Sequence, residues 1–302
     1  MTAGTRTTIL EDIHQSFQAA AESLPAYRHI LPFFENLFTL QEAAVAAASP
    51  APVPLPPDLE TAGSENRLPL LNRSRLPYDE TAAMDLMLAI CREAASASHQ
   101  LAAGAATISS GLEKMNGAVR RGLRLFMGAD DPGIRTLSAE MNMEESILRF
   151  YLYHSTWPSV ASQVIRIQES HIMDGVHWDH GYCPVCGSLP DLAFLAENGG
   201  QWLVCEFCRH QWPFKRIRCP GCGNQNSHSV IYFFSDAEPA YRVHTCGVCK
   251  LYIKTVDRRR LARPFYPPLE KIVTAHLDMK ARGLGFSTCA KTKPQKSCSG
   301  LL

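Results

Sequence analysis

Within residues 1–176, apolar residues recur every three or four positions, which is the spacing of one face of an α-helix. Two such stripes lie before residue 41: Ile9, Ile13, Phe17, Ala20 and Leu24, then Ile30, Phe33, Phe34, Leu37 and Leu40. Three more follow: Met84, Met87, Leu88 and Cys91, then Ile147, Leu148, Tyr151 and Leu152, then Val160, Val164 and Ile167. This pattern predicts an α-helical bundle. Thr156 before Pro158 predicts that the last of these helices begins separately.

A proline-rich stretch interrupts the helical pattern. Five prolines fall between Ser49 and Pro57, and a proline inside a helix removes a hydrogen bond and clashes with the preceding turn. We therefore expect a loop over about residues 49–77. Leu68, Leu70 and Leu71 could dock this loop on the bundle as an extended strap, and disorder is the alternative.

The spacing of apolar residues is no longer helical after residue 180, where short β-prone runs alternate with turn residues. Residues 189–196 and 201–204 flank Asn198-Gly199-Gly200, and residues 229–234 and 241–245 flank a second turn, so two β-hairpins are predicted. A helical stripe returns after them, which predicts a C-terminal helix: Leu269, Ile272, Val273, His276 and Leu277. From residue 284 the chain is polar, and we expect a disordered tail.

Eight of the eleven cysteines form four Cys-x-x-Cys pairs around the hairpins. Two cysteines three apart can turn both sulfurs toward one point when the backbone makes a tight knuckle, and two knuckles complete a tetrahedral site. Gaps of 18 residues (187–204) and 23 residues (223–245) leave room for the hairpins, whereas ten residues (209–218) separate the middle pairs. The spacing therefore predicts two metal sites: Cys183, Cys186, Cys205 and Cys208 in the first, and Cys219, Cys222, Cys246 and Cys249 in the second.

The residue after each second cysteine is expected to take a positive φ, because that turn points backbone N–H groups at sulfur. Gly187 and Gly223 hold this position in the two leading knuckles, and glycine adopts a positive φ without steric cost. Arg209 and Lys250 hold it in the trailing knuckles. Some strain is therefore expected there.

Disulfides and redox-active dithiols are the competing interpretations of the cysteine pairs. Disulfides need an oxidising compartment, and Glu11 and Asp12 interrupt Ile9-Leu10 before a signal segment forms, so we expect a cytoplasmic protein. A catalytic dithiol is usually a single pair at a helix start. Metal chelation is therefore favoured, with a structural role as the simplest reading. Four thiolates suit either iron or zinc, so two ions of one or the other are expected.

Other potential ligands lie near the hairpins: His177, Asp179, His180, His210, His228 and His244. The cluster at 177–180 could suggest a third metal site, but a hinge with Trp178 packed on the first ribbon is the favoured interpretation. The other histidines could replace a thiolate, which the full set of cysteines makes unnecessary. Cys91 lies on an apolar helical stripe and is expected in the core, and Cys289 and Cys298 are interpreted as incidental thiols of the tail.

The order of these motifs resembles the formate dehydrogenase accessory protein FdhE family. It runs Cys-Pro-Val-Cys-Gly-Ser (183–188), Cys-x-x-Cys-x-x-x-Trp (205–212), Cys-x-x-Cys (219–222) and Cys-x-x-Cys-x-x-Tyr-x-Lys (246–254), and covers about residues 180–256. The resemblance implies rubredoxin-like iron sites in a cytoplasmic, non-catalytic maturation factor that contacts the catalytic subunit of formate dehydrogenase. Lys250 is a departure, since the family more often has glycine there.

The charge distribution raises a rival function from another class. Residues 1–180 hold 13 Lys and Arg against 21 Asp and Glu, and residues 181–302 hold 17 against 8. The predicted ribbons lie in the basic part of the chain, residues 181–302. The alternative function is therefore that of a zinc-ribbon nucleic-acid-binding protein. Eight thiolates with two divalent ions reduce that positive excess, however, so nucleic acid is the less favoured partner. The aromatic residues near the hairpins are expected to be ribbon core: Trp202, Phe207, Trp212, Phe214, Tyr232, Phe233 and Phe234.

Two further classes find no support in the sequence. It contains no Gly-rich phosphate loop, nucleophile elbow or paired acid and base, so we expect no enzyme activity. It also has no run of eighteen apolar residues, so we expect no membrane span. The oligomeric state is left open.

The predicted protein is of the α+β class. An α-helical domain (1–176) precedes two tandem rubredoxin-like or zinc-ribbon β-hairpin modules with four cysteines each (181–216 and 217–265). A C-terminal helix (266–283) and a tail (284–302) complete it.

Overall fold

The chain folds into two units with different secondary structure. The computed structural model describes residues 3–48, 50–53, 69–95, 97–114, 116–235 and 237–289. Met1–Pro57 and Leu71–Asp174 form the helical unit, and Asp58–Leu70 and Gly175–Leu302 form the cysteine unit. Helices lie in both units and the sheet lies in the second, which confirms the predicted α+β class.

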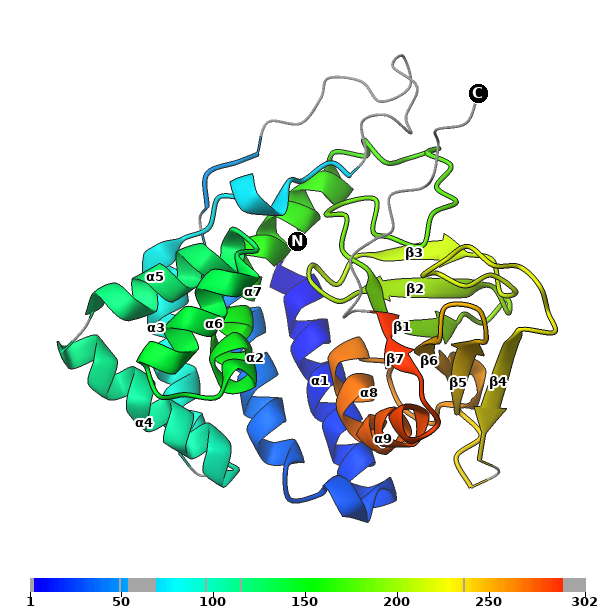
Figure 1. The fold of residues 1–302 in the computed structure, drawn as a ribbon, viewed down its shortest axis with the longest axis horizontal. Helices are drawn as coiled ribbons and strands as arrows, with labels where there is room; N and C mark the ends of the chain where they lie inside the picture. The colour runs from blue at the N-terminus through cyan, green and yellow to red at the C-terminus, as the bar shows by residue number, and fades with distance from the viewer. Residues whose placement is uncertain are drawn as a thin grey trace. The chain divides into compact units, whose positions relative to one another are not determined.

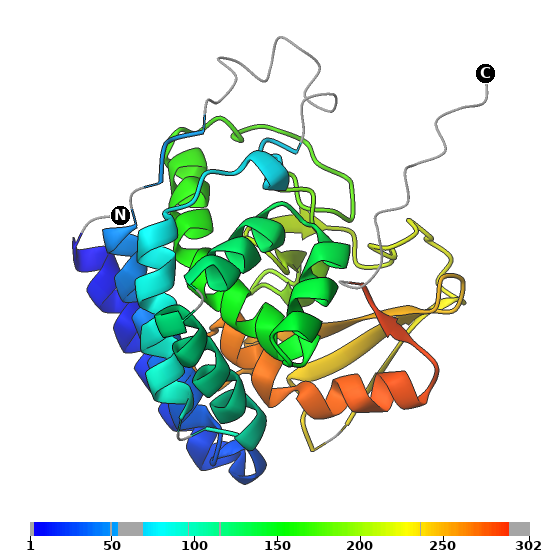
Figure 2. The same ribbon diagram turned by 60° about the vertical axis from the view of Figure 1, so that its left-hand side comes forward.

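The described part of the helical unit contains seven α-helices (Figures 1 and 2). They are α1 (Ala3–Ser23), α2 (Leu31–Ala47), α3 (Glu80–Ala94), α4 (His99–Lys114), α5 (Asn116–Met127), α6 (Asp131–Glu140) and α7 (Glu145–Glu169). The predicted stripes face the core, since Ile13, Phe17, Leu37 and Tyr151 are at most 1% exposed. Across the residues described, each helix is too short or too polar to cross a membrane.

Helix α7 continues through Pro158, so the predicted separate start at Thr156 is wrong. Pro158 has no N–H to donate to the carbonyl of His154, four residues earlier. That carbonyl instead accepts a hydrogen bond of 2.8 Å from Nε2 of Gln41, which is fully buried on α2. The Thr156 hydroxyl, which was expected to cap a new helix, donates to the carbonyl of Leu152 at 2.7 Å. A contact with a distant helix therefore replaces the missing backbone bond.

The described ends of the proline-rich loop dock on both units, whereas the strap interpretation expected the helical bundle alone. The Leu70 N–H donates to the Pro184 carbonyl of the cysteine unit at 3.1 Å, and the other contacts lie in the helical unit. Gln163 of α7 donates to the Ala51 carbonyl at 2.8 Å, and Leu71 is 1% exposed. A short 3-10 helix, η3 (Arg73–Arg75), follows, and Arg73 donates to the Phe126 carbonyl at 2.9 Å. Residues 54–68, including Leu68, lie outside the described residues.

The cysteine unit is built on a sheet that has seven strands within the described residues. Its strands are β1 (Pro190–Leu195), β2 (Gln201–Cys205), β3 (Gln211–Phe214), β4 (Val230–Phe234), β5 (Tyr241–Cys246), β6 (Leu251–Asp257) and β7 (Ser287–Thr288). The order is β3-β2-β1-β6-β5-β4, with β7 also beside β6 (Figure 1). The predicted hairpins are β1–β2 and β4–β5, and both are antiparallel.

The two cysteine modules share this sheet. We define the first module as residues 183–214 and the second as residues 219–257; each contributes three strands in the order knuckle, strand, strand, knuckle, strand. The parallel pair β1–β6 joins them, with Phe194 opposite Val256. Every residue of β6 is buried, as expected for a strand at the centre of a covered sheet. The sequence analysis expected two ribbons in tandem and did not predict this join.

The C-terminal helix predicted over 266–283 is two helices, α8 (Pro267–Val273) and α9 (Ala275–Gly283). Lys254 of β6 lies under the break at Thr274. Its Nζ donates to the carbonyl of Lys271 at 3.1 Å and to Asp278 Oδ2 at 2.7 Å. A helix end needs partners for its last carbonyls, and here a side chain of the sheet supplies one.

A buried ion pair connects α8 to the segment that precedes it. Arg263 Nη1 lies 2.6 Å from Glu270 Oε1, and the two side chains are 5% and 0% exposed. Tyr241 of β5 donates to Glu270 Oε2 at 3.1 Å. Burial raises the pKa of Glu270, and Arg263 opposes that rise.

Part of the segment expected to be a disordered tail is ordered. Ser287 and Thr288 form β7 beside β6, and Cys289 directly after it is 1% exposed. Only two residue pairs join β7 to β6. A strand of two residues is too short to recognise from the sequence. Residues 290–302, with Cys298, lie outside the described residues.

Candidate metal centres

Four knuckles of the same geometry carry the cysteine pairs. In each, the carbonyl of the first cysteine accepts a hydrogen bond from the N–H four residues later, at 2.9 to 3.2 Å. That donor residue has a positive φ in every knuckle: 76° at Gly187, 59° at Arg209, 74° at Gly223 and 58° at Lys250. The predicted positive φ is therefore present, and two of the four positions bear side chains that disfavour it.

The first group of sulfurs is formed by the knuckles that precede β1 and follow β2. Cys183 Sγ lies 3.6 Å from Cys208 Sγ, and Cys186 Sγ lies 3.4 Å from Cys205 Sγ. All four side chains are buried, and all four sulfurs lie within 4.8 Å of one another.

The second group is formed by the knuckles that precede β4 and follow β5. Cys219 Sγ lies 3.5 Å from Cys249 Sγ, and Cys222 Sγ lies 3.7 Å from Cys246 Sγ. Cys219 and Cys246 are buried, whereas Cys222 and Cys249 are half-buried. The grouping of cysteines is thus the one that the gap lengths predict, and the second group is the more accessible to solvent.

The separation of the sulfurs fits metal coordination. Four sulfurs at about 2.3 Å from a central ion lie about 3.8 Å apart at the corners of a tetrahedron. A disulfide would bring two sulfurs to about 2.05 Å, so the observed 3.4 to 3.7 Å contacts are not disulfides. Both groups could each hold one tetrahedral metal ion.

Burial makes a cation necessary if all four sulfurs of the first group are ionised. Burial raises the pKa of Cys205 and of Cys208 well above the usual range of a thiol. Hydrogen bonds with neighbouring sulfurs, first Cys183, lower the pKa of Cys186 well below it. Several thiolates in a water-free site are costly unless a positive charge lies among them, and a metal ion supplies that charge.

Backbone N–H groups favour a thiolate in the second group. Burial raises the pKa of Cys246, but hydrogen bonds from the N–H groups of Cys249 and Val248 lower it, and the pKa is about 7. Asn224 Nδ2 approaches the same sulfur at 3.8 Å. Burial raises the pKa of Cys249 to about 11.

The segment before the first knuckle packs as the favoured hinge interpretation expects. Trp178 is 7% exposed, its Nε1 donates to the Tyr182 carbonyl at 2.8 Å, and its ring contacts His180. Asp179 forms an ion pair with Arg218 at 2.6 Å and with Lys215 at 3.1 Å. Of the described residues, only the eight cysteines form groups suited to a metal ion, so the third site is not supported.

The nearby histidines lie outside both sulfur groups. Burial lowers the pKa of His210 and of His244 to about 4, so both are neutral at pH 7. His228 is exposed.

Cys91 lies in the core of the helical unit, as predicted. It is 3% exposed on α3, and burial raises its pKa to about 12.

Cys289 lies beside the second group and was missed in the sequence analysis. Burial raises its pKa to about 12, and charges on Cys249, Cys246 and Cys222 raise it further. The eight-residue gap between Cys289 and Cys298 is not a knuckle, and no local pattern links Cys289 to residues 40 positions earlier. The one signal in the sequence was that Cys289 directly follows Ser287 and Thr288, the two residues that form β7.

The aromatic residues divide between the two modules. Phe207, Trp212 and Phe214 are buried in the first module, as predicted. In the second module, Tyr232 and Phe234 are 55% and 51% exposed on β4, so the prediction that they form ribbon core is wrong. Strand β4 is an edge of the sheet, and no described element covers this part of its surface.

Comparisons with known proteins agree with the motif pattern. No model of a known protein family matches the sequence. A protein FdhE homolog of Aquifex aeolicus (strain VF5) is 32% identical over 151 residues, which are 49% of this chain and 52% of that protein. A protein FdhE homolog of Haemophilus influenzae (strain PittEE) is 27% identical over 162 residues, 51% of each chain. The chain spans about half the length of these curated relatives.

The fold extends the similarity along the chain. The crystal structure of the FdhE protein from Pseudomonas aeruginosa matches with a TM-score of 0.66 and covers 94% of both chains, at 20% sequence identity. Sequence similarity over about half the chain, the shared fold and the two four-cysteine groups confirm the predicted resemblance to the FdhE family.

Proposed function

We propose that this chain is a cytoplasmic, non-catalytic accessory factor for the maturation of formate dehydrogenase, and that it binds the catalytic subunit of that enzyme. Its relationship to FdhE homologues, together with two tetrahedral four-cysteine groups, supports the proposal. The main observation behind the proposal is the pair of four-cysteine groups, because each could hold a metal ion.

Each group binds one metal ion in this proposal. Cys183, Cys186, Cys205 and Cys208 hold the first ion, and Cys219, Cys222, Cys246 and Cys249 hold the second. Four thiolates suit iron or zinc, and the family resemblance favours iron. When bound, the ion neutralises the buried thiolates and, if it is iron, can also carry a single electron.

The two sites differ in role. The fully buried first site stabilises the fold, because no ligand is open to solvent and metal binding contributes to folding free energy. The second site has two half-buried ligands, and Val248 beside them is 64% exposed. This is the site that a partner or an electron donor can approach.

Strand β4 provides the face for the catalytic subunit. Tyr232 and Phe234 lie on the same face of the strand and are each more than half exposed, and an edge strand leaves backbone donors and acceptors for a partner. Val230 of β4 pairs with Cys246, so this face is continuous with the second metal site. Exposed apolar side chains grouped in this way are typical of a protein interface.

The experiment that tests the proposal is anaerobic affinity purification of the tagged chain from its native host grown on formate. Mass spectrometry identifies the proteins recovered, and metal analysis is made on the same sample. We expect to recover the catalytic subunit of a formate dehydrogenase and to find two metal ions per chain. A variant with Cys219 and Cys246 replaced by alanine should lose the catalytic subunit and the second ion. Cys91→Ala is the matched control, since it removes a buried cysteine of the helical unit.

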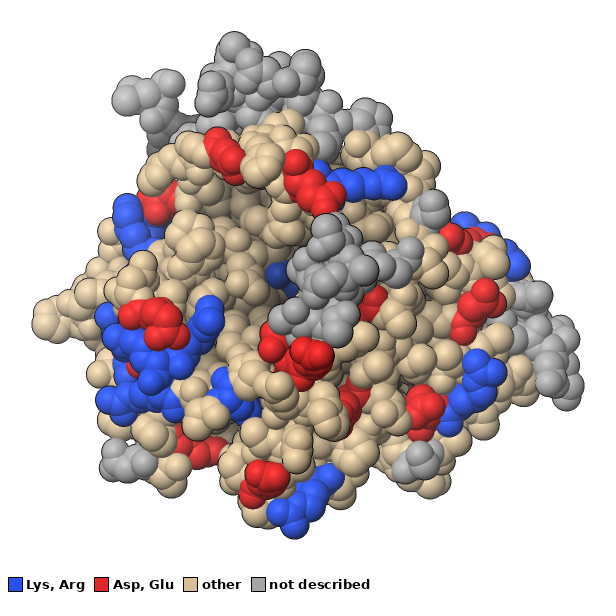
Figure 3. All heavy atoms as spheres, turned by 180° about the vertical axis from the view of Figure 1, so that it is seen from behind, with Lys and Arg blue, Asp and Glu red and all other residues tan. Residues whose placement is uncertain are grey.

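Nucleic-acid binding remains the alternative, because Tyr232 and Phe234 are exposed and Arg242 stacks over Tyr232 at 5.6 Å, an arrangement that suits base stacking. Figure 3 shows one group of Lys and Arg side chains with Asp and Glu side chains beside it, and the other charges on that face are scattered and of both signs. Salt distinguishes the two functions. Binding to phosphates weakens steeply with ionic strength, whereas an apolar protein contact does not. Recovery of nucleic acid with zinc, lost at high salt, would contradict the maturation role.

A further inference from the structure

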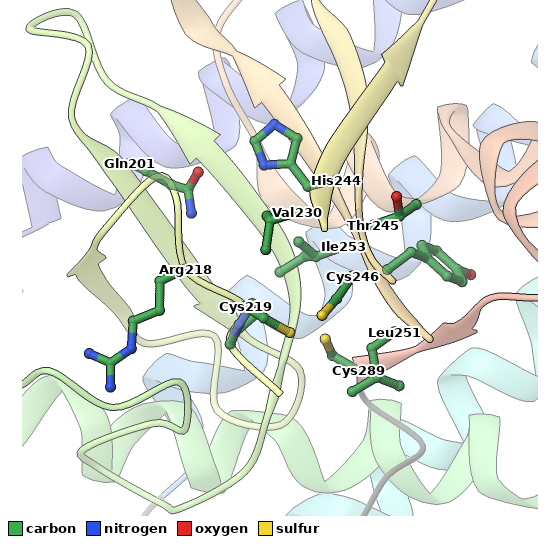
Figure 4. A pocket seen from close by; sticks show the side chains of 12 residues that line it. Gln201, Arg218, Cys219, Val230, His244, Thr245, Cys246, Leu251, Ile253 and Cys289 are labelled. Carbon is green, nitrogen blue, oxygen red and sulfur yellow. The ribbon is translucent and has the colours of Figure 1, made fainter. Parts of the chain in front are cut away.

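A small cavity lies between the second four-cysteine group and Cys289 (Figure 4). Cys219, Cys246 and Cys289 all line it, and Figure 4 shows their sulfur atoms turned toward the same space. Its volume is ≈ 10 Å³, about the room that one water molecule needs. A fifth thiol therefore faces the metal-binding sulfurs across a short gap.

Strand β7 holds Cys289 in this position. It pairs with Leu251 and Tyr252, which directly follow the trailing knuckle of the second group. The Ser287 N–H also donates to the Lys250 carbonyl, in that knuckle, at 2.8 Å. Cys289 is thus attached to the same backbone that carries Cys246 and Cys249.

The cavity also contains a polar group that lacks a partner. Gln201 is 4% exposed and lines the cavity, and its Oε1 is buried without a hydrogen bond. Such an atom is costly to bury unless a donor reaches it. A water molecule in the cavity would supply such a donor.

The two groups differ in how easily a ligand can be lost. Cys222 and Cys249 are half-buried, so solvent, chelators or a partner's thiol can reach them, whereas the first group is fully buried. Among the described residues, no fifth cysteine accompanies the first group. A reserve thiol lies at the site where a ligand is accessible.

We propose that Cys289 is a reserve ligand of the second metal site, which replaces the accessible Cys249 when that thiolate leaves the metal. The inference rests on the proposed metal binding and adds to it an exchangeable ligand set. It means that Cys249 can leave the metal and become available to a partner, while the second site keeps its ion and four thiolate ligands.

The exchange is a ligand substitution with no change of oxidation state. As its Sγ bonds to the metal, Cys289 gives its proton to solvent, and Cys249 takes a proton from solvent as its own bond breaks. The number of thiolate ligands and the net charge are the same before and after. Cys289 must move toward the group to do this, and a strand of two residues offers little resistance.

The test compares cobalt-loaded variants, because the visible absorption of Co²⁺ reports the number of thiolate ligands. Cys249→Ala should retain a second four-thiolate ion, and the double variant Cys249→Ala/Cys289→Ala should not. Cys208→Ala removes the equivalent cysteine of the first group and should lose one four-thiolate ion, since no reserve thiol lies there. If Cys249→Ala also loses one, or fails to fold, the inference is overturned.

A second measurement uses a variant with all eight proposed ligands intact. In zinc-loaded Cys289→Ala, release of the second ion to a chromogenic chelator should be about tenfold faster than in the unaltered chain, while release of the first ion is unchanged. Equal release rates would overturn the inference. If the unaltered chain holds no second ion, the proposed function itself fails, which is a different result.

Discussion

Leu192 of β1 lies opposite Lys254 of β6, in the parallel strand pair that makes one sheet of the two cysteine modules. Leu192 is fully buried and Lys254 is 5% exposed, so the join is in the interior. The Lys254 ammonium reaches past the sheet to the break between α8 and α9. Strand pairing and helix attachment therefore depend on the same residue pair.

Loss of the second metal site should weaken both modules. Cys219→Ala removes a ligand next to β4–β6, and β1 pairs directly with β6. We expect hydrogen–deuterium exchange to increase in β4, β5 and β6 and also in β1. Cys91→Ala should leave exchange in the sheet unchanged. Unaltered protection of β1 in Cys219→Ala would mean that the modules are independent.

The positive φ of Lys250 should cost stability that glycine recovers. Lys250→Gly and Lys250→Ala both remove the contact of the ammonium with Phe286, but only alanine keeps a Cβ at φ 58°. We expect the glycine variant to be about 1 kcal/mol more stable than the alanine variant in urea unfolding. Gly187→Ala adds a Cβ at φ 76°, so this variant should be less stable than the unaltered chain. Equal stability of the two Lys250 variants would contradict the strain.

Removal of Arg263 should destabilise the cysteine unit strongly. Arg263→Met leaves Glu270 buried without its counter-ion, which costs about 3–5 kcal/mol. The loss should be smaller at low pH, because burial raises the pKa of Glu270 and a protonated carboxyl carries no charge. Arg260→Met, at an exposed position of η4 (Arg258–Arg260), is the control with little effect. Urea unfolding followed by tryptophan fluorescence measures both.

Asp257 should contribute stability that acid removes. Its side chain is buried, and hydrogen bonds from Arg259, at 2.8 Å, hold its pKa below the usual range, with Arg242 adding to the effect. A lowered folded-state pKa stabilises the protein above the unfolded-state value of about 3.9 and is lost as the pH falls through the folded-state value. We expect Asp257→Asn to be about 1–2 kcal/mol less stable at pH 7, and the difference to shrink below about pH 4. A constant difference from pH 7 to pH 3 would show that the charge is not responsible.

A charge on β4 should weaken binding of the catalytic subunit. Tyr232→Glu places a carboxylate on the proposed contact face, where Tyr232 is 55% exposed, so the fold should be retained. We expect about tenfold less enzyme in the affinity purification, as for loss of one interface anchor. Met279→Glu changes a side chain on α9 that is 69% exposed and serves as the matched control. Equal recovery from both variants would exclude the β4 face.

Much of the fold and the composition of both sulfur groups could be predicted from local patterns. The helical stripes placed Ile13, Phe17 and Tyr151 in the core, and the turn at 198–200 indicated the β1–β2 hairpin. The grouping of the cysteines was also predictable, because two cysteines three apart share one knuckle and a hairpin of sufficient length brings two knuckles together.

The sequence by itself determined these features because each depends on residues that are close along the chain. Only the tertiary structure decided the parallel β1–β6 pair, the passage of α7 through Pro158 and the position of Cys289. These depend on contacts between distant residues: Phe194 with Val256, Gln41 with His154, and β7 with the knuckle at Lys250. Sequence spacing carries no record of such contacts, since the energy of burial depends on which surfaces meet in the folded chain.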